Sequence, residues 1–153
     1  MARWLVKSEP DVYSIDDLKA QKVTTWEGVR NYQARNYLRS MTKGDEMLFY
    51  HSNCDEPGVV GIATVARTAY PDPTQFDPTH KYFDPASNPA DPRWSLVDVR
   101  FKRKLKRTVT LTELKARADE LGEFPLVRKG NRLSVIPVTD EQWAAITAME
   151  AGR

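Results

Sequence analysis

EMLFYHSNCDEPGVVGIATVAR, residues 46–67, is the stretch that decides the fold. Two apolar runs, 46–52 and 59–67, flank the turn sequence NCDEPG, which is the pattern of two antiparallel strands joined by a hairpin. Gly61 lies inside the second run and indicates a β-bulge or the close approach of another backbone. We therefore expect this segment to form a hairpin within an antiparallel sheet.

Helices are predicted at four places, each from a capping residue at its start. They cover residues 15–20 after Ser14, 31–41 with Asn31 as cap, about 111–120 after Thr110, and a C-terminal stretch after Thr139. In the second helix, apolar residues recur at i, i+3, i+4 and i+7, which gives one buried stripe. The C-terminal helix is expected to turn Trp143, Ile146 and Met149 inward.

Further strands complete the expected sheet. Residues 3–7 and 94–101 suit strands, and 126–138 is expected to form a short hairpin around Lys129-Gly130-Asn131. Because strands outnumber helices and turns join several of them, the expected fold class is α+β, with a mostly antiparallel, curved or closed sheet and helices at its ends. A single domain over residues 1–153 is expected, since the length suits one core and no linker or internal repeat is apparent.

The composition argues against several classes of protein and site. At 41% hydrophobic and 29% charged residues the chain resembles an ordinary globular protein, and no apolar run is long enough to cross a membrane. The start, MARWLVKSEP, lacks the pattern of a signal peptide, so a cytoplasmic location is expected. The only cysteine, Cys54, allows neither an internal disulfide nor a thiolate zinc site, and no cofactor or metal is expected.

Residues 69–93 differ from the rest of the chain. They hold six of the ten prolines and show no helical or strand periodicity. A long irregular segment inside a compact domain is usually functional or disordered. Four aromatic residues argue against plain disorder: Tyr70, Phe76, Tyr82 and Phe83.

Residues 26–31, WEGVRN, admit two interpretations. In the first, Gly28 permits a turn, Asn31 caps the following helix, and Trp26 is an ordinary core residue. In the second, Trp26 presents a ring face at the rim of a pocket, while Arg30 and Asn31 offer hydrogen bonds to a flat polar ligand such as a base. The pattern alone is compatible with both.

The first strand and the hairpin strand both end in polar residues. At the end of the first strand Lys7 and Glu9 form either a surface pair or part of a pocket, in which the carboxylate of Glu9 accepts a hydrogen bond from an exocyclic amine such as that of cytosine. The pocket candidates from these two strand ends are Lys7, Ser8, Glu9, Tyr50 and Ser52. His51 has no serine or cysteine beside it in a known catalytic motif, so nucleophilic catalysis is not favoured.

Basic residues gather in two places. On a strand, Arg100, Lys102, Lys104 and Lys106 share one face, and a second cluster contains Arg128, Lys129 and Arg132. Each cluster is either a solvated surface, where lysines protect an edge strand, or a set of phosphate contacts. The formal net charge is only +2, which suggests modest affinity for bulk nucleic acid.

Several segments taken together resemble the EVE domain family. They include WLVKSEP, WEGVRNYQARNYLRSMTKGDEMLFYHSN, GVVGIATV and GNRLSVIPV, and the match covers nearly the whole chain in order. The resemblance implies a PUA-like fold, similar in architecture to the YTH domains that hold a methylated base in an aromatic cage. It implies a non-catalytic reader of modified bases, methylated or hydroxymethylated cytosine among them, in DNA or RNA. In bacteria such proteins are associated with restriction systems, which are therefore expected partners.

The resemblance also implies roles for particular residues. Trp26 falls where the YTH pattern has its first cage tryptophan, and Tyr82 or Phe83 is the expected second aromatic. Lys7, Ser8 and Glu9 fall on the segment that contacts the base, with Glu9 replacing an amide. Phosphate contacts are expected from Arg30 and from Arg100, Lys102, Arg128 and Arg132. Trp26→Ala is expected to abolish binding and leave the fold intact.

Two alternatives stay open at this stage. Some PUA-like relatives are hydrolases that use a lysine and a carboxylate in one cavity, and Lys7 with Glu9 makes a hydrolase of modified nucleosides conceivable. The other alternative is a PUA-type module that binds structured RNA without regard to modification. Strong salt dependence with no preference for modified bases would favour that module.

Overall fold

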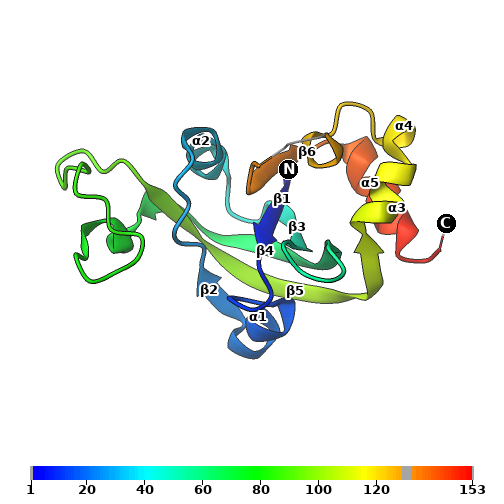
Figure 1. Cartoon of the computed structure of the whole chain (residues 1–153), viewed down its shortest axis with the longest axis horizontal. Helices are drawn as coiled ribbons and strands as arrows, with labels where there is room; N and C mark the ends of the chain where they lie inside the picture. The colour runs from blue at the N-terminus through cyan, green and yellow to red at the C-terminus, as the bar shows by residue number, and fades with distance from the viewer. Residues whose placement is uncertain (1, 129–131, 153) are drawn as a thin grey trace.

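The structure is a computed structural model and describes residues 2–128 and 132–152 (Figure 1). Its described strands are β1 (Arg3–Ser8), β2 (Val23–Thr25), β3 (Glu46–His51), β4 (Gly58–Pro71), β5 (Ser95–Thr110) and β6 (Val135–Val138). Its described helices are α1 (Ile15–Gln21), α2 (Tyr32–Ser40), α3 (Leu111–Ala116), α4 (Ala118–Leu121) and α5 (Asp140–Met149), with short 3-10 turns η1 (Pro73–Phe76) and η2 (Pro125–Val127). The strands form one sheet in the order β2-β5-β4-β3-β1-β6. The predicted α+β class is confirmed.

The central hairpin is confirmed. β3 and β4 pair antiparallel with Leu48 opposite Ile62, whereas β1 and β3 pair parallel. The pairing of β4 with β5 shifts register between Val59 and Gly61, so the expected bulge is present. A side chain at Gly61 would clash with α1, because a Cβ atom there would lie 2.5 Å from Cδ1 of Ile15.

Three expectations about elements were wrong or incomplete. The helix expected over 111–120 is broken at Arg117, whose backbone angles (φ −111°, ψ 27°) separate α3 from α4. The hairpin expected over 126–138 is absent from its described part, because η2 occupies Pro125–Val127 and β6 pairs with β1 instead. Its expected turn at 129–131 lies outside the described residues. The three-residue strand β2, which pairs with β5, was not predicted.

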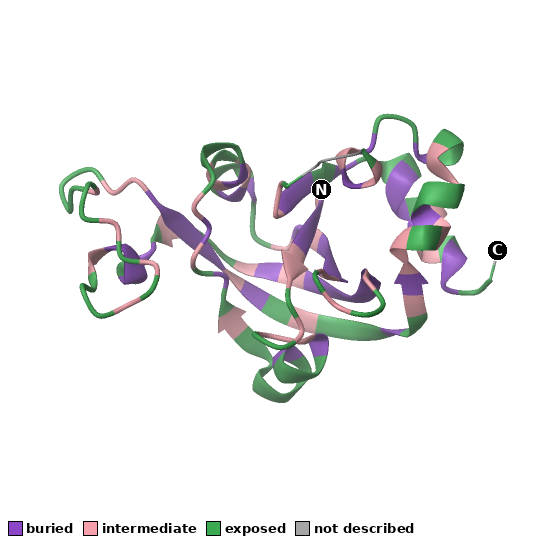
Figure 2. Cartoon of the chain, in the orientation of Figure 1, coloured by how far each residue is buried: buried purple, intermediate pink, exposed green. Residues whose placement is uncertain are grey.

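Each face of the sheet carries its own apolar core. Along β1, Trp4 and Val6 point into one core while Leu5 points into the other, as the alternation of a strand requires. The first core is covered by α1 and α2. The second is covered by α3, α4 and α5, and it buries Trp143, Ile146 and Met149 as predicted. In Figure 2, stretches of the central strands carry the purple of buried residues.

The segment 69–93 is ordered by its own polar contacts. It forms a lobe at one end of the molecule, beyond the ends of β4 and β5 (Figure 1). The buried amide of Gln75 donates to the backbone oxygens of Asp72 and Trp94 (2.6 and 2.8 Å), and its oxygen accepts from the Ser87 hydroxyl and the Trp94 N–H. One side chain thus ties the beginning of this segment to its end, which explains how an irregular segment keeps a fixed shape.

Among the helices of the described residues, none combines the length and the apolar character that a membrane span requires.

Candidate functional site

A cavity of about 670 Å³ opens where the end of β1, residues 24–30 and the tip of the segment 69–93 meet. Its size falls within the range of small-molecule sites, roughly 300–1,000 Å³. Its walls come from chain segments that are far apart in sequence, including residues 7–9, residues 80–82 and Arg132. The cavity mixes aromatic rings with charged and hydroxyl groups, which is the chemistry that a flat, polar ligand needs.

Trp26 is both a core residue and part of the cavity wall. Only 8% of the residue is exposed, and its ring packs edge-on against Phe49, with centroids 5.4 Å apart and planes at 84°. Its backbone N–H donates to the carbonyl oxygen of Val97 at 2.8 Å. The two interpretations of residues 26–31 are therefore compatible, because the core contacts fix a ring whose remaining surface lines the cavity.

Tyr82 is held in the cavity wall by Gly28. A Cβ atom at Gly28 would lie 2.3 Å from Cε2 of Tyr82, so the ring lies directly against the glycine backbone. Gly28 also has φ of +82°, a conformation that side-chain-bearing residues rarely adopt. The glycine is needed both for the turn and for the close approach of the ring.

Arg30 fastens the segment 69–93 to the turn at Gly28. Its guanidinium donates to the backbone oxygen of Tyr82 (2.7 and 3.2 Å), to the carboxylate of Asp72 (3.2 Å), to the hydroxyl of Thr74 (3.0 Å) and to its own chain at Val29 (3.1 Å). These contacts use all five of its N–H donors. Arg30 therefore has no donor left for a base or a phosphate, and its role is to position Tyr82.

The carboxylate of Asp72 is the acceptor on which this arrangement converges. It is fully buried and accepts from the backbone N–H of Gly28 (2.8 Å), from Thr74 and from Arg30. Burial alone would raise the pKa of Asp72, but the hydrogen bonds from Gly28, Thr74 and Arg30 outweigh it and lower the pKa below its usual value. Asp72 is thus ionised and holds the two sides of the site together.

Lys7 brings an amine to the cavity. It is half-buried, and its ammonium lies 6.0 Å from the ring centroid of Tyr50. Burial lowers its pKa. Neighbouring polar groups are fixed by local contacts, since the hydroxyl of Ser8 donates to the Tyr13 carbonyl (2.6 Å) and the N–H of Ser52 donates to the Ser8 carbonyl (3.0 Å). In the described part of the chain, the Lys7 ammonium forms no ion pair.

Residues 2–149 match the EVE domain family. This protein belongs to the EVE domain family. Human thymocyte nuclear protein 1 is 44% identical over 166 residues, which cover 97% of this chain and 74% of that protein. A crystal structure of a protein from Pseudomonas putida is 52% identical, with a TM-score of 0.95 and coverage of 97% of this chain and 99% of that chain. The crystal structure of human THYN1 in complex with 5-methylcytosine-containing DNA is 44% identical, with a TM-score of 0.90 and 98% of each chain covered.

Of the residues predicted to bind a base in this EVE domain, seven line the cavity: Lys7, Ser8, Glu9, Trp26, Arg30, Ser52 and Tyr82. Three do not. Asn31 is an exposed N-cap whose side-chain oxygen accepts from the Ala34 N–H (2.9 Å), Tyr50 is buried beneath Lys7, and Phe83 lies outside the cavity wall. Of the two predicted loop aromatics, Tyr82 lines the cavity and Phe83 does not.

The residues predicted to contact phosphates are dispersed. Arg132 lines the cavity, while Arg100 lies on β5 outside the cavity wall. Lys102 is paired with Glu46 at 2.6 Å, and Arg128 lies 3.9 Å from Glu123. Of these four residues, only Arg132 lines the cavity.

Sequence reasoning missed several residues of the EVE domain's cavity. His80 and Lys81 line it beside Tyr82, and Tyr13 and Ser134 are also among its lining residues. The adjacency of His80 and Lys81 to a predicted aromatic was the one available signal. Asp72 carried no local signal, because its partner Gly28 is 44 residues away in the chain.

Proposed function

We propose that this EVE domain binds a modified cytosine, flipped out of nucleic acid, in the cavity lined by Trp26 and Tyr82. The observation that carries the proposal is that two aromatic rings, from segments far apart in sequence, are each locked into the wall of one cavity. The 44% identical human THYN1, crystallised with 5-methylcytosine-containing DNA, supports the same class of ligand. We propose DNA as the polymer on this ground.

The free-energy cost of flipping a base and the gain from stacking it on an aromatic ring are of similar size. Flipping a base out of a duplex costs a few kcal/mol, and stacking on an aromatic side chain contributes about 1–3 kcal/mol per base. Phe49 and Gly28 already hold the two rings in place, so little ordering entropy is lost when the base enters.

The polar groups of the cavity supply the hydrogen bonds that a cytosine requires. One oxygen of the exposed Glu9 carboxylate accepts from the side-chain amide of Asn53 at 2.8 Å, which orients the carboxylate as an acceptor for the exocyclic amine of the base. Lys7 donates to the carbonyl oxygen of the base. Arg132 and Lys81 contact the flanking phosphates.

A binding panel tests the proposal. Short single strands and duplexes, each with one cytosine, 5-methylcytosine or 5-hydroxymethylcytosine at the same place, are titrated with the protein by fluorescence anisotropy, and RNA strands are included. We expect tighter binding to a modified strand, and Tyr82→Ala is expected to remove the preference. Equal binding to modified and unmodified strands contradicts the proposal, and equal, salt-sensitive binding to RNA supports the modification-independent RNA module.

Lys7 favours a second candidate, a hydrolase acting on modified nucleosides. Its half-buried amine, with a lowered pKa, faces the same cavity as Glu9. Incubation with modified nucleosides, followed by chromatography, tests this directly. Turnover that disappears in Lys7→Met supports the enzyme, and intact substrate after prolonged incubation contradicts it.

A cytoplasmic location and partnership with a restriction system belong to the proposal as well. They are expectations from the sequence and from the family resemblance, whereas vertebrate relatives carry the name thymocyte nuclear protein 1. Cell fractionation tests the location, and co-purification with a nuclease tests the partnership.

A further inference from the structure

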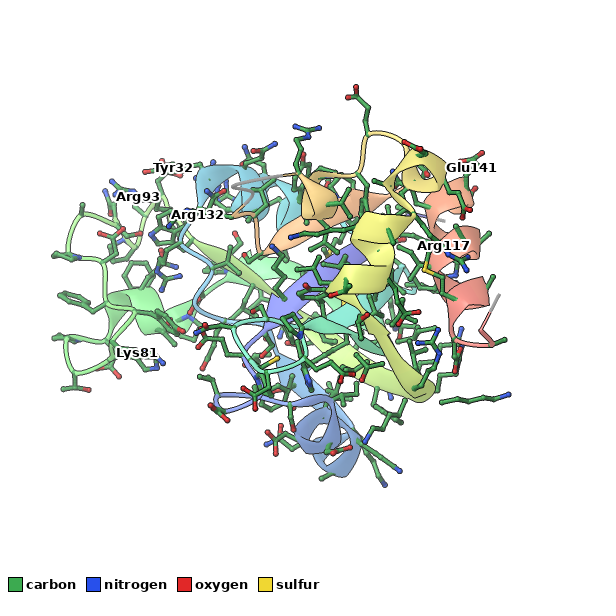
Figure 3. All side chains as sticks on the ribbon, turned by 45° about the vertical axis from the view of Figure 1, so that its right-hand side comes forward. Tyr32, Lys81, Arg93, Arg117, Arg132 and Glu141 are labelled. Atoms are coloured by element: carbon green, nitrogen blue, oxygen red, sulfur yellow. The ribbon has the colours of Figure 1, made fainter. Side chains whose placement is uncertain are left out.

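A second cavity, of about 360 Å³, lies between α2 and the segment 69–93. Three arginines line it: Arg35 and Arg39 from α2, and Arg93 from the end of the segment. Figure 3 shows Tyr32 and Arg93, both in the wall of this cavity, on the same side of the molecule. None of these residues was predicted to belong to a site.

The three arginines are held together by neutral oxygen atoms. Arg35 donates to the backbone oxygen of Arg93 at 3.1 Å, and Arg39 donates to the same oxygen at 3.3 Å and to that of Pro92 at 3.1 Å. Arg39 also donates to the hydroxyl of Ser95 at 3.0 Å. These contacts fix the guanidinium groups of Arg35 and Arg39 through uncharged oxygen atoms.

The cavity therefore carries a net positive charge. Arg93 lies 3.3 Å from the carboxylate of Asp84, but Arg35 and Arg39 form no ion pair within residues 2–128 and 132–152. One carboxylate, that of Asp91, also lines the cavity. Burial and repulsion from Arg39 lower the pKa of Arg35, which shows that the fold keeps cations together against their mutual repulsion.

A continuous series of stacked groups joins this cavity to the base pocket. Arg35 lies 4.8 Å from the ring centroid of Tyr32, which stacks on Trp94 at 5.0 Å and 27°. Arg30 lies 5.5 Å from the ring of Trp94 and 5.5 Å from that of Tyr82. Four successive side-chain contacts thus connect the arginine cavity to the pocket wall, along a path that includes the buried Trp94. Tyr32, 52% exposed, lies on this path.

We propose that Arg35, Arg39 and Arg93 bind a backbone phosphate of the strand whose modified base occupies the cavity at Trp26 and Tyr82. This inference rests on the proposed function and adds the route of the strand. Guanidinium groups match phosphate oxygens with paired, charge-assisted hydrogen bonds, and a phosphate supplies the negative charge that the cavity lacks. Contacts to a phosphate carry no sequence information, so the site raises affinity without choosing the base.

Charge-removing variants test the site. Arg35→Gln and Arg39→Gln are each expected to weaken binding to methylated and unmethylated strands by the same factor, about tenfold, because a hydrogen bond to a charged group is lost. The preference for the methylated strand stays unchanged. The slope of log affinity against log salt concentration falls by about 0.9 for a duplex or about 0.7 for a single strand. The control is Lys115→Gln, which removes the same charge from an exposed residue of α3 at the other end of the molecule (Figure 1).

Neutral linkages locate the phosphate. Oligonucleotides carrying one uncharged methylphosphonate linkage at successive positions from the 5-methylcytosine are titrated with the wild type and with Arg39→Gln. We expect one position at which the neutral linkage weakens wild-type binding about tenfold and leaves Arg39→Gln binding unaffected. If no position behaves in this way, or if both variants keep the wild-type salt slope, the inference is wrong.

Two further measurements separate this site from its alternatives. Arg39→Lys keeps the charge and is expected to keep most of the salt slope. A slope that falls in Arg39→Lys as much as in Arg39→Gln assigns Arg39 to loop anchoring and overturns the phosphate role. Thermal melting of each variant shows whether the segment 69–93 stays folded. If the wild type binds methylated and unmethylated strands equally, the proposed function is contradicted. The salt slope and the linkage scan test the arginines alone.

Discussion

The ring of Tyr82 lies against the backbone of Gly28, so closely that a methyl group at position 28 would come within 2.3 Å of the ring carbon Cε2. This contact joins an irregular segment to the turn that follows Trp26. Arg30 and Asp72 lock it from either side, through the backbone oxygen of Tyr82 and the N–H of Gly28. The aromatic wall of the pocket is therefore assembled before any ligand arrives.

Gly28→Ala is expected to destabilise the protein through two effects. A side chain in the left-handed conformation costs about 1–2 kcal/mol, and the collision with Tyr82 adds about 1–3 kcal/mol. Gly122→Ala is the matched control, because Gly122 also has positive φ (+62°) but has no atom within 4 Å of its Cβ position. Chemical denaturation measures the free energy of unfolding of both variants. Equal losses in the two variants would show that the contact with Tyr82 is unimportant.

Trp26→Ala is expected to destabilise the fold as well as to abolish binding. This corrects the expectation that the fold stays intact, since Trp26 is a buried member of the first core. Truncating a buried tryptophan costs about 3–5 kcal/mol. Trp26→Phe keeps an aromatic ring and is expected to fold while binding the modified base more weakly. Melting curves and anisotropy titrations on the same samples separate the two effects, and wild-type affinity in Trp26→Phe would exclude a stacking role that needs the indole.

Arg30→Lys and Arg132→Gln are expected to weaken binding in different ways. Arg30→Lys keeps the charge but has only three donors, so Tyr82 loses its anchor, the free energy of unfolding falls by about 1–3 kcal/mol, and the salt slope stays the same. Arg132→Gln leaves stability unchanged and lowers the salt slope by about 0.9 on duplex DNA. Titrations at several salt concentrations measure the salt slope of each variant. A reduced slope in Arg30→Lys would contradict the anchoring role.

The stability of the protein is expected to depend on Asp72 at low pH. The pKa of Asp72 is lower in the folded protein than its usual value of 3.8, so its ionisation stabilises the folded state above about pH 4. That stability is lost as the pH falls through the lowered pKa. Asp72→Asn is expected to be less stable at pH 7, by about 3–5 kcal/mol for a broken buried pair, and to show a shallower decline below pH 4. Denaturation from pH 7 to pH 2 measures this, with Asp119→Asn on α4 as an exposed control. Parallel profiles of stability against pH for the wild type and Asp72→Asn would contradict a stabilising role of Asp72 ionisation.

Local signals in the sequence identified most elements correctly. Ser14, Asn31, Thr110 and Thr139 cap the helices that follow them, as predicted. Such signals depend on residues three or four positions apart, so the chain itself brings them together. β2 was missed because three residues are too few to show a period.

The sequence by itself determined the central hairpin, the cap of α2, the membership of the EVE domain family and ten candidate residues for a pocket. Only the tertiary structure decided which of them share it. Tyr82 meets Arg30 across 52 residues of chain, and Arg30 meets Asp72 across 42. It also placed Asn31 outside the cavity wall and paired Lys102 with Glu46. The physical reason is that hydrogen bonds and ring contacts depend on distance in space, and an irregular segment carries no periodicity from which that distance is predicted.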